Sequence, residues 1–207
     1  MEVDYTLYLL TDRKILEGKD LSRAVEEAIR GGVTLLQMRE KEVSTREFYE
    51  LALEMKELAL SFKLPLIIND RLDIALAVDA DGLHIGQDDL PLTAARKLLG
   101  PGKILGLSVS NVEEAVYGEE NGADYLGAGA VYHTGSKDIA APPIGPGGLK
   151  KIKDAVSIPV VAIGGIGLSN IHEVKETGVD GVAVISAILG SQDIESAARN
   201  LFNAWRR

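Results

Sequence analysis

The stretch PVVAIGGIGLSNIHEVKETGVDGVAVISA, residues 159–187, contains two short apolar runs joined by a helix-like segment. Both runs are rich in valine and isoleucine, which favour strands. The first run ends in Gly164 and Gly165, and the second ends at Ser186. In barrels of parallel strands, backbone N–H groups and a hydroxyl at the ends of these two strands recurrently form a phosphate site. The stretch therefore predicts the last two strands of such a barrel and a phosphorylated ligand.

The same alternation of short apolar runs and amphipathic segments extends over the whole chain of 207 residues. Eight such units predict an α/β protein with one domain, a (β/α)8 TIM barrel over residues 1–207. A doubly wound open sheet would show the same alternation, but no glycine fingerprint follows the first strand, where Leu9–Arg13 forms the turn. The predicted strands are Thr6–Asp12, Thr34–Glu40, Leu64–Asp70, Gly82–Gly86, Lys103–Val109, Tyr125–Val131, Pro159–Gly165 and Gly181–Ala187.

Helices are predicted between the strands by apolar residues at helical spacing and by capping residues. Ser44, three residues before Glu47, predicts one helix start, and Ser191 predicts the start of the last helix. The phrases GGVTLLQ (31–37), NGADYLG (121–127) and TGVDGVA (177–183) look like one helix-to-strand connection used three times. The expected apolar faces are Leu21, Ala24, Val25 and Ala28; Phe48, Leu51, Ala52, Met55 and Leu58; Leu92, Ala95 and Leu98; and Ile194, Ala197, Ala198, Leu201 and Trp205.

Composition and charge exclude several classes of function. The 22 basic and 31 acidic residues give a net charge of −9, which argues against a broad nucleic-acid surface. The absence of cysteine excludes disulfides, thiolate metal sites and cysteine nucleophiles. The acidic start MEVDYTLYLLTD is unlike a secretory signal, and no apolar stretch approaches the ~18 residues of a membrane span. We expect a cytoplasmic protein with small-molecule substrates, no nucleic-acid or membrane partner, and an assembly compatible with a homodimer.

The second predicted strand carries Gln37, Arg39 and Lys41 at a spacing of two residues. This spacing makes all three side chains project from one face, while Leu36 and Met38 occupy the other. In a barrel, the pattern directs an amide and two cations toward the interior at the carboxyl end of the strand. A frayed strand end with solvated charges would show the same pattern.

Carboxylates follow the third and fourth predicted strands, at Asn69-Asp70 and at Gly86-Gln87-Asp88-Asp89. Because adjacent strands lie ~4.8 Å apart, carboxylates at neighbouring strand ends can share a cation. A set of oxygen ligands without cysteine or histidine suits Mg²⁺. Asn-Asp and Asp-Asp are also common in turns, and Asp70 could equally cap the next helix.

In the segment from Tyr132 to Asp138, the hydroxyls of Thr134 and Ser136 and the ammonium of Lys137 together suit a phosphate or pyrophosphate. A variable surface loop with polar residues is the alternative interpretation. Of the histidines, His84 is expected in the core because its strand is apolar, and His172 is expected to be exposed on a helix. His133, in the polar loop, is the histidine expected nearest to any chemistry.

Seven short motifs, in order along nearly the whole chain, together resemble those of thiamine phosphate synthases, also called thiamine-phosphate pyrophosphorylases. The resemblance implies a TIM-barrel transferase of thiamine biosynthesis. Such an enzyme joins 4-amino-2-methyl-5-hydroxymethylpyrimidine pyrophosphate to 4-methyl-5-hydroxyethylthiazole phosphate and releases pyrophosphate. The motifs are Gln37-x-Arg39-x-Lys41, Asn69-Asp70, Gly86-Gln87-x-Asp89, Gly106-x-Ser108, Thr134-x-Ser136-Lys137, Ile163-Gly164-Gly165-Ile166 and Ile185-Ser186.

The resemblance also implies a role for each matching residue. Asp70 and Asp89 would bind Mg²⁺, and Lys137, Arg39, Lys41 and Ser108 would be catalytic. Ser136 stands where the family frequently has threonine, which preserves the hydroxyl. The implied substrate contacts are Arg39, Lys41, Asn69 and Lys137 to the pyrophosphate, with Gln37 and Ser108 beside it; Thr134 and Ser136 to the thiazole; and Gly165, Ile185 and Ser186 to the thiazole phosphate.

The expected chemistry is a Mg²⁺-assisted, dissociative displacement that needs no protein nucleophile, consistent with the absence of a recognisable Ser-His-acid arrangement. Two relatives of the fold remain alternatives: a thiazole tautomerase, and a barrel that binds a phosphorylated ligand without catalysis. Neither alternative needs the charged residues Arg39, Lys41, Asp70, Asp89 and Lys137 together. A sugar-phosphate isomerase would use the same phosphate site but would need a general base above a carbon.

Overall fold

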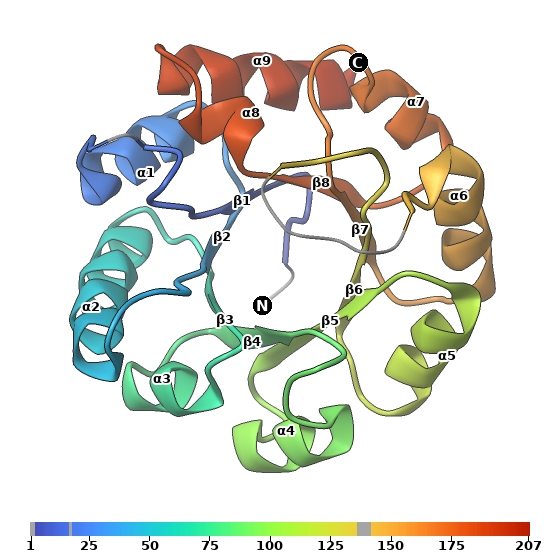
Figure 1. Ribbon diagram of the computed structural model, residues 1–207, viewed down its shortest axis with the longest axis horizontal. Helices are drawn as coiled ribbons and strands as arrows, with labels where there is room; N and C mark the ends of the chain where they lie inside the picture. Colours follow the sequence, from blue (N-terminus) through green and yellow to red (C-terminus); the bar gives the residue numbers. More distant parts are fainter. Residues whose placement is uncertain (1–2, 17, 136–141) are drawn as a thin grey trace.

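The computed structural model describes residues 3–16, 18–135 and 142–207, and in these residues eight parallel strands close into a barrel (Figure 1). Neighbouring strands follow the order of the sequence, and the eighth pairs with the first. This closure confirms the predicted (β/α)8 fold and excludes the open sheet. The strands are β1 (Leu7–Leu10), β2 (Leu35–Met38), β3 (Leu66–Asn69), β4 (Gly82–Ile85), β5 (Ile104–Val109), β6 (Tyr125–Gly129), β7 (Val160–Ile163) and β8 (Gly181–Val184).

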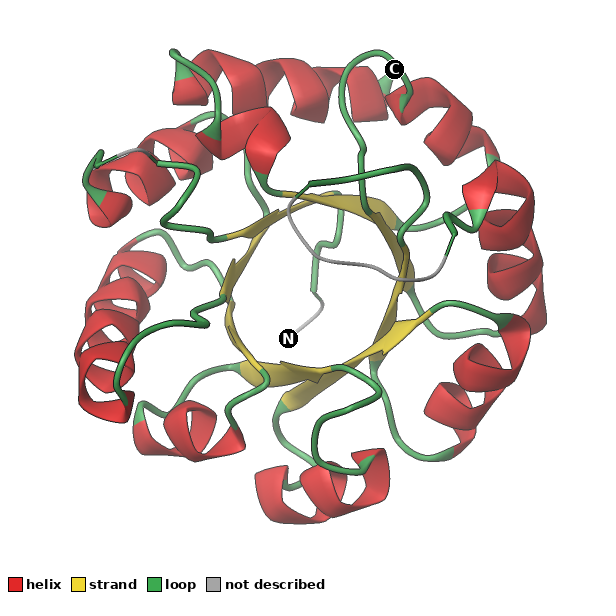
Figure 2. Ribbon diagram, viewed as in Figure 1, coloured by secondary structure: helices red, strands yellow, loops and turns green. Residues whose placement is uncertain are grey.

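Helices surround the strands as an outer ring (Figure 2). Each strand is shorter than predicted, because the ends of the apolar runs belong to the loops that lead to these helices. No helix in the described part of the chain combines the length and apolar character that crossing a bilayer requires. The described helices are α1 (Leu21–Arg30), α2 (Thr45–Ser61), α3 (Leu72–Ala77), α4 (Leu92–Leu99), α5 (Val112–Glu120), α6 (Gly145–Ala155), α7 (Ile171–Glu176), α8 (Ser186–Leu189) and α9 (Ile194–Arg206).

The apolar side chains of the strands form two separate cores. Outward-facing residues such as Leu36 and Met38 pack against the helices, as their alternation predicts. Inward-facing residues, among them Tyr8 and Tyr125, fill the barrel itself. Burial of each large apolar side chain stabilises the fold by about 1.5–3 kcal/mol. Because the same alternation holds along β2, Gln37 faces the barrel interior, where its amide contacts Tyr8.

The repeated phrase at 31–37, 121–127 and 177–183 has a structural cause at the amino-terminal end of the barrel. Its fourth residue is Thr34, Asp124 or Asp180, and each side chain accepts a hydrogen bond from the backbone N–H at the start of the preceding strand. The phrase therefore ties each strand to the one before it. The donors are Leu7 (3.0 Å), Leu105 (2.7 Å) and Val160 (2.8 Å), and Asp81 does the same for Leu66 at 2.9 Å.

Two details of the predicted helices are wrong, and one is confirmed. Ser44 caps α2 as predicted, since its side chain accepts from the N–H of Glu47. The last helix is capped by Asp193 instead of Ser191, whose hydroxyl donates to the carbonyl of Asp193. On α4, Leu98 is 59% exposed, and Leu99 packs into the core with Leu92 and Ala95. The buried face of α4 continues from Leu92 to Leu99, seven residues later, whereas the prediction continued it to Leu98, six residues later, which lies off the apolar face of a helix.

Arg96 of α4 binds the connections that lead into β5 and β6, so its replacement by methionine is expected to destabilise the fold. Its guanidinium bonds the carbonyls of Gly122, Gly100 and Lys103 at 2.8–3.0 Å and pairs with Asp124. Methionine keeps the apolar stem but leaves these acceptors without a donor, at a cost of about 2–3 kcal/mol in unfolding free energy.

Urea unfolding of the Arg96→Met variant measures this cost. The matched control is Arg23→Met on α1, where an exposed arginine pairs with Glu27 and with no other carboxylate among the described residues. The control should change the unfolding free energy by less than about 0.5 kcal/mol. Equal effects of the two substitutions would show that Arg96 adds nothing beyond a surface ion pair.

Candidate active site

One cavity of about 520 Å³ opens at the carboxyl ends of the strands. Its size lies within the range of ordinary small-molecule sites. Ser136 and Lys137 lie outside the described residues. Every described residue of the predicted set lines this cavity, namely Gln37, Arg39, Lys41, Asn69, Asp70, Asp89, Ser108, Thr134, Gly165, Ile185 and Ser186.

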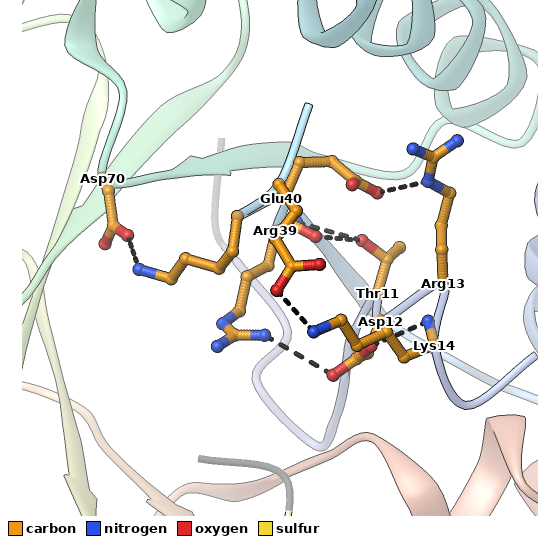
Figure 3. Close-up of polar contacts among 9 residues, drawn as sticks. Thr11, Asp12, Arg13, Lys14, Arg39, Glu40 and Asp70 are labelled. Carbon is orange, nitrogen blue, oxygen red and sulfur yellow. Dashed lines mark hydrogen bonds and ion pairs between the residues drawn. The ribbon is translucent and has the colours of Figure 1, made fainter. Parts of the chain in front are cut away.

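Arg39 is positioned by the residues that follow β1. The fully buried Thr11 receives a hydrogen bond from the Arg39 N–H at 3.0 Å and donates from its own N–H to the Gln37 carbonyl at 2.9 Å. The Arg39 guanidinium reaches toward Asp12, 3.5 Å away, and the two side chains are only 17% and 13% exposed (Figure 3). This arrangement holds a cation at the cavity wall and partly neutralises it in the free protein.

Glu40 shows that the alternation along this segment continues beyond the end of β2. The Glu40 side chain points away from the cavity and toward Arg13, with its Oε1 atom 3.2 Å from Nε of that arginine (Figure 3). Burial raises the pKa of the Glu40 carboxyl, against the lowering effect of the Arg13 guanidinium. Residues 39 and 41 therefore face the cavity, as predicted, while residue 40 faces away.

The carboxylates after β3 and β4 lie close together. Asp70 has a left-handed backbone (φ 62°), and its N–H donates to the carbonyl of His84 at 2.8 Å, which ties it to β4. Asp89 accepts from the N–H of Gly86 at 2.7 Å. Burial raises the pKa of the Asp89 carboxyl, and the neighbouring Asp70 carboxylate raises it further. Asp70 also forms an ion pair with Lys41, so a cation already faces this pair of carboxylates.

The two carboxylates form a pair and not a larger cluster: among the described residues, no group of three or more His, Cys, Asp or Glu side chains could hold a metal. Two carboxylates at the edge of an open cavity fit Mg²⁺, which retains waters and takes its remaining ligands from substrate phosphates. Asp70 does not cap α3. The N-cap position is occupied by Arg71, one residue later, and no side chain forms a capping hydrogen bond there.

Two polar residues of the cavity floor, Tyr8 and His84, were not assigned to the site from the sequence. His84 is buried and both its ring nitrogens are bonded, as expected of a core residue, but it also lines the cavity. Its Nε2 lies 2.9 Å from the hydroxyl of Ser108, and its Nδ1 lies 2.8 Å from the hydroxyl of Tyr125. The latter hydroxyl contacts that of Tyr8 at 2.8 Å, and the Gln37 amide donates to Tyr8 at 2.6 Å.

The loops after β7 and β8 form the opposite wall. Gly165 has a φ of +67°, and a Cβ there would lie 2.6 Å from the carbonyl oxygen of His133, so only glycine fits. After β8, Ser186 begins the short helix α8, which the sequence did not predict. Ile185 and Ser186 line the cavity beside the glycine turn. His133 itself is exposed and does not line the cavity, and His172 is exposed on α7, as expected.

Comparisons with known proteins agree with the motifs. Residues 7–188 match the family model described as thiamine monophosphate synthase. A thiamine-phosphate synthase of Desulfitobacterium hafniense strain Y51 is 59% identical, and the match covers 100% of each chain. A thiamine-phosphate synthase of Clostridium botulinum strain Hall is 57% identical, and the match covers 97% of this chain and 98% of that protein. A thiamine phosphate pyrophosphorylase from Pyrococcus furiosus superposes with a TM-score of 0.91 at 44% identity, covering 98% of this chain and 96% of that one. The chain therefore belongs to the thiamine monophosphate synthase family, as its strand-end motifs predict.

Proposed function

We propose that the protein is a transferase that joins 4-amino-2-methyl-5-hydroxymethylpyrimidine pyrophosphate to 4-methyl-5-hydroxyethylthiazole phosphate, giving thiamine phosphate and pyrophosphate. The observation that supports this proposal is that one cavity has two different walls, each lined by groups suited to an anion. One wall, over β2 to β4, combines cations with a pair of carboxylates. The other, after β7 and β8, combines a glycine turn with a serine hydroxyl. Two phosphorylated substrates can therefore meet in the space between them.

The wall over β2 to β4 is suited to the pyrimidine pyrophosphate. Arg39 and Lys41 supply positive charge for the pyrophosphate, and the Asn69 amide at the end of β3 adds a donor. Asp70 and Asp89 would hold Mg²⁺. When bound there, Mg²⁺ would neutralise charge on the departing pyrophosphate. Because Lys41 forms an ion pair with Asp70 in the free protein, its ammonium is already placed at the edge of this site.

The chemical step needs charge stabilisation and positioning more than a protein nucleophile. The bond between the pyrimidine methylene carbon and oxygen breaks, and the electron pair leaves with pyrophosphate. The aminopyrimidine ring stabilises the positive charge left on the methylene carbon. The thiazole nitrogen then donates its electron pair to that carbon and forms the new C–N bond. Arg39, Lys41 and Lys137 stabilise the leaving group, and Gln37 and Ser108 hold the ring beneath it.

The wall after β7 and β8 is suited to the thiazole phosphate. Gly165 and Ile185 place backbone groups at the cavity, and Ser186 adds a hydroxyl. Thr134 lines the cavity between the two walls, where the thiazole ring would lie, with Ser136 as the second proposed contact. The thiazole nitrogen would then face the methylene carbon of the pyrimidine.

Replacement of Ser186 by alanine is expected to raise the KM for thiazole phosphate about tenfold, with a smaller change in kcat. The reason is that a hydrogen bond to a charged phosphate is lost from the ground state and the transition state alike. Steady-state kinetics with thiazole phosphate as the varied substrate measures this effect. Ser61→Ala, at the exposed end of α2, is the matched control. An unchanged KM in Ser186→Ala would remove Ser186 from the phosphate site.

Chromatographic detection of thiamine phosphate after incubation with both substrates tests the proposed function. The proposal requires product only when the pyrimidine pyrophosphate and the thiazole phosphate are both present. A protein that rearranges a thiazole phosphate tautomer but forms no thiamine phosphate would instead be a tautomerase. A protein that binds thiazole phosphate and changes neither substrate would be a binding module. The expected cytoplasmic location and homodimer stay predictions, to be checked by fractionation and light scattering.

A further inference from the structure

A continuous chain of hydrogen bonds crosses the floor of the cavity and joins residues of five strands, β1, β2, β4, β5 and β6. It runs from the Gln37 amide nitrogen to the Tyr8 hydroxyl (2.6 Å) and from there to the Tyr125 hydroxyl (2.8 Å). It continues to Nδ1 of His84 (2.8 Å) and from Nε2 to the hydroxyl of Ser108 (2.9 Å). The two ends of the chain are residues that line the cavity and are proposed to touch the pyrimidine.

The Gln37 amide nitrogen can donate but cannot accept, so the direction of the chain is inferred from this end. Burial raises the pKa of both phenols well above the ordinary value, so each phenol is neutral and has one proton to donate. The Gln37 amide donates to Tyr8, so the proton of Tyr8 goes to Tyr125. The proton of Tyr125 then goes to Nδ1 of His84. A neutral imidazole that accepts at Nδ1 carries its own proton on Nε2, which lies 2.9 Å from the Ser108 hydroxyl and can donate to it.

The two ends of the chain consequently have opposite polarity. Because Ser108 accepts from His84, its own proton is available to a ligand in the cavity. Because Gln37 uses its nitrogen on Tyr8, its carbonyl oxygen remains as an acceptor, and this oxygen is buried without a partner among the described residues. The floor thus presents one donor and one acceptor. A 4-aminopyrimidine has the complementary edge, with an amino donor beside a ring-nitrogen acceptor.

We propose that Tyr8, Tyr125 and His84 are positioning residues that set this polarity and thereby select an amino-substituted over an oxo-substituted pyrimidine. The inference rests on the proposed function and adds the basis of its substrate choice. A 4-oxopyrimidine places a carbonyl opposite the Gln37 oxygen and an N–H opposite the Ser108 proton. Both contacts are then repulsive, and a site built around buried polar groups rejects such a ligand strongly.

Two glycines make room for the chain. A Cβ on Gly106 would lie 2.3 Å from the Tyr125 ring and 2.4 Å from Nδ1 of His84. A Cβ on Gly127 would lie 3.0 Å from Cε1 of the same histidine. The strands that flank the two rings therefore lack side chains where the chain passes, which supports a role for the rings at these positions.

The first test is the tautomer of His84, read from the ¹⁵N shifts of the imidazole nitrogens in the whole protein. The chain has three histidines, so the signals can be assigned by replacing His133 and His172 in turn. The proposal requires the Nε2–H tautomer at neutral pH and its loss in Tyr125→Phe. A wild-type ring protonated on Nδ1, or on both nitrogens, would overturn the proposed direction.

The second test compares binding of 4-amino- and 4-oxo-2-methyl-5-hydroxymethylpyrimidine monophosphate by calorimetry. These probes have no pyrophosphate to lose, so the Kd values report binding alone. The expected result is a wild-type preference of more than 100-fold for the amino compound, which falls roughly tenfold in Tyr125→Phe and in Tyr8→Phe. The matched control is Tyr5→Phe, because the Tyr5 ring packs 5.0 Å from that of Tyr125 but takes no part in the chain.

The outcomes separate the two proposals. If the wild-type protein binds neither probe and forms no thiamine phosphate, the proposed function fails. If the wild-type protein prefers the amino probe, but Tyr125→Phe and Tyr8→Phe keep the full preference, the positioning role is wrong. The same conclusion follows if Tyr5→Phe lowers the preference as much as Tyr125→Phe, because general packing in the barrel would then be the cause. Thermal unfolding of each phenylalanine variant confirms that the compared proteins are folded.

Discussion

Replacement of Arg39 by glutamine is expected to lower kcat/KM for the pyrimidine pyrophosphate by about 10²–10³-fold, the usual effect of removing one donor that stabilises developing charge. The guanidinium is held at the cavity wall by Asp12 and by the backbone bonds of Thr11, so little reorganisation precedes its use. Glutamine keeps a donor of similar shape but removes the charge. The measurement is the initial rate of thiamine phosphate formation at saturating thiazole phosphate.

Lys14→Gln is the matched control for Arg39→Gln. Lys14 lies near Arg39 in the same group of charges, but its exposed ammonium pairs with Glu42 and does not line the cavity (Figure 3). This control should keep kcat/KM within about twofold, because an exposed ion pair contributes little. If Arg39→Gln lowers the rate no more than Lys14→Gln does, the contribution of the Arg39 charge is only to the general field of the protein.

Replacement of Asp89 by asparagine is expected to reduce turnover by about 10²-fold at about 1 mM Mg²⁺. The reason is that a bound metal supplies several kcal/mol of charge stabilisation, which the variant would lose. Asparagine retains an oxygen that can accept from the Gly86 N–H, so the turn itself should persist. It removes one of the two negative charges proposed to hold Mg²⁺, so the affinity for Mg²⁺ is expected to fall. Initial rates over a range of Mg²⁺ concentrations measure the effect.

The pattern over Mg²⁺ concentration distinguishes a metal ligand from a structural residue. Asp89→Asn should recover part of its activity at high Mg²⁺, and its melting temperature should stay close to that of the wild-type protein. Asp79→Asn, at the opposite end of the barrel where Asp79 pairs with Lys103, is the control and should leave the Mg²⁺ dependence unchanged. A Mg²⁺ dependence of Asp89→Asn identical to that of the wild-type protein would exclude this carboxylate from metal binding.

The fold could be predicted because its determinants are local and repeated. Each strand is a short apolar run, and the alternation of inward and outward residues follows from backbone geometry. The same rule places Gln37, Arg39 and Lys41 on one side and Leu36 on the other, and the structure has them so. The position of the site then follows, because the carboxyl ends of all eight strands meet at one end of the barrel.

What the sequence did not reveal depends on contacts between distant strands. Tyr8, His84 and Tyr125 each look like ordinary core residues within their own apolar strands, and their connection appears only when β1, β4 and β6 face one another. A polar residue at an inward position of several strands is the signal that could have found them. The ion pair between Lys41 and Asp70 was missed for a similar reason, because both were assigned to ligands and not to each other.

The most direct test of the account is the release of pyrophosphate by the purified protein with both substrates, first with Mg²⁺ and then with EDTA. The account predicts that pyrophosphate and thiamine phosphate form in equal amounts, and that EDTA stops both. Formation of thiamine phosphate at the same rate in EDTA would contradict the metal site at Asp70 and Asp89. No pyrophosphate and no thiamine phosphate from the two substrates with Mg²⁺ would contradict the central claim that the two anion-binding walls of one cavity serve a coupling reaction.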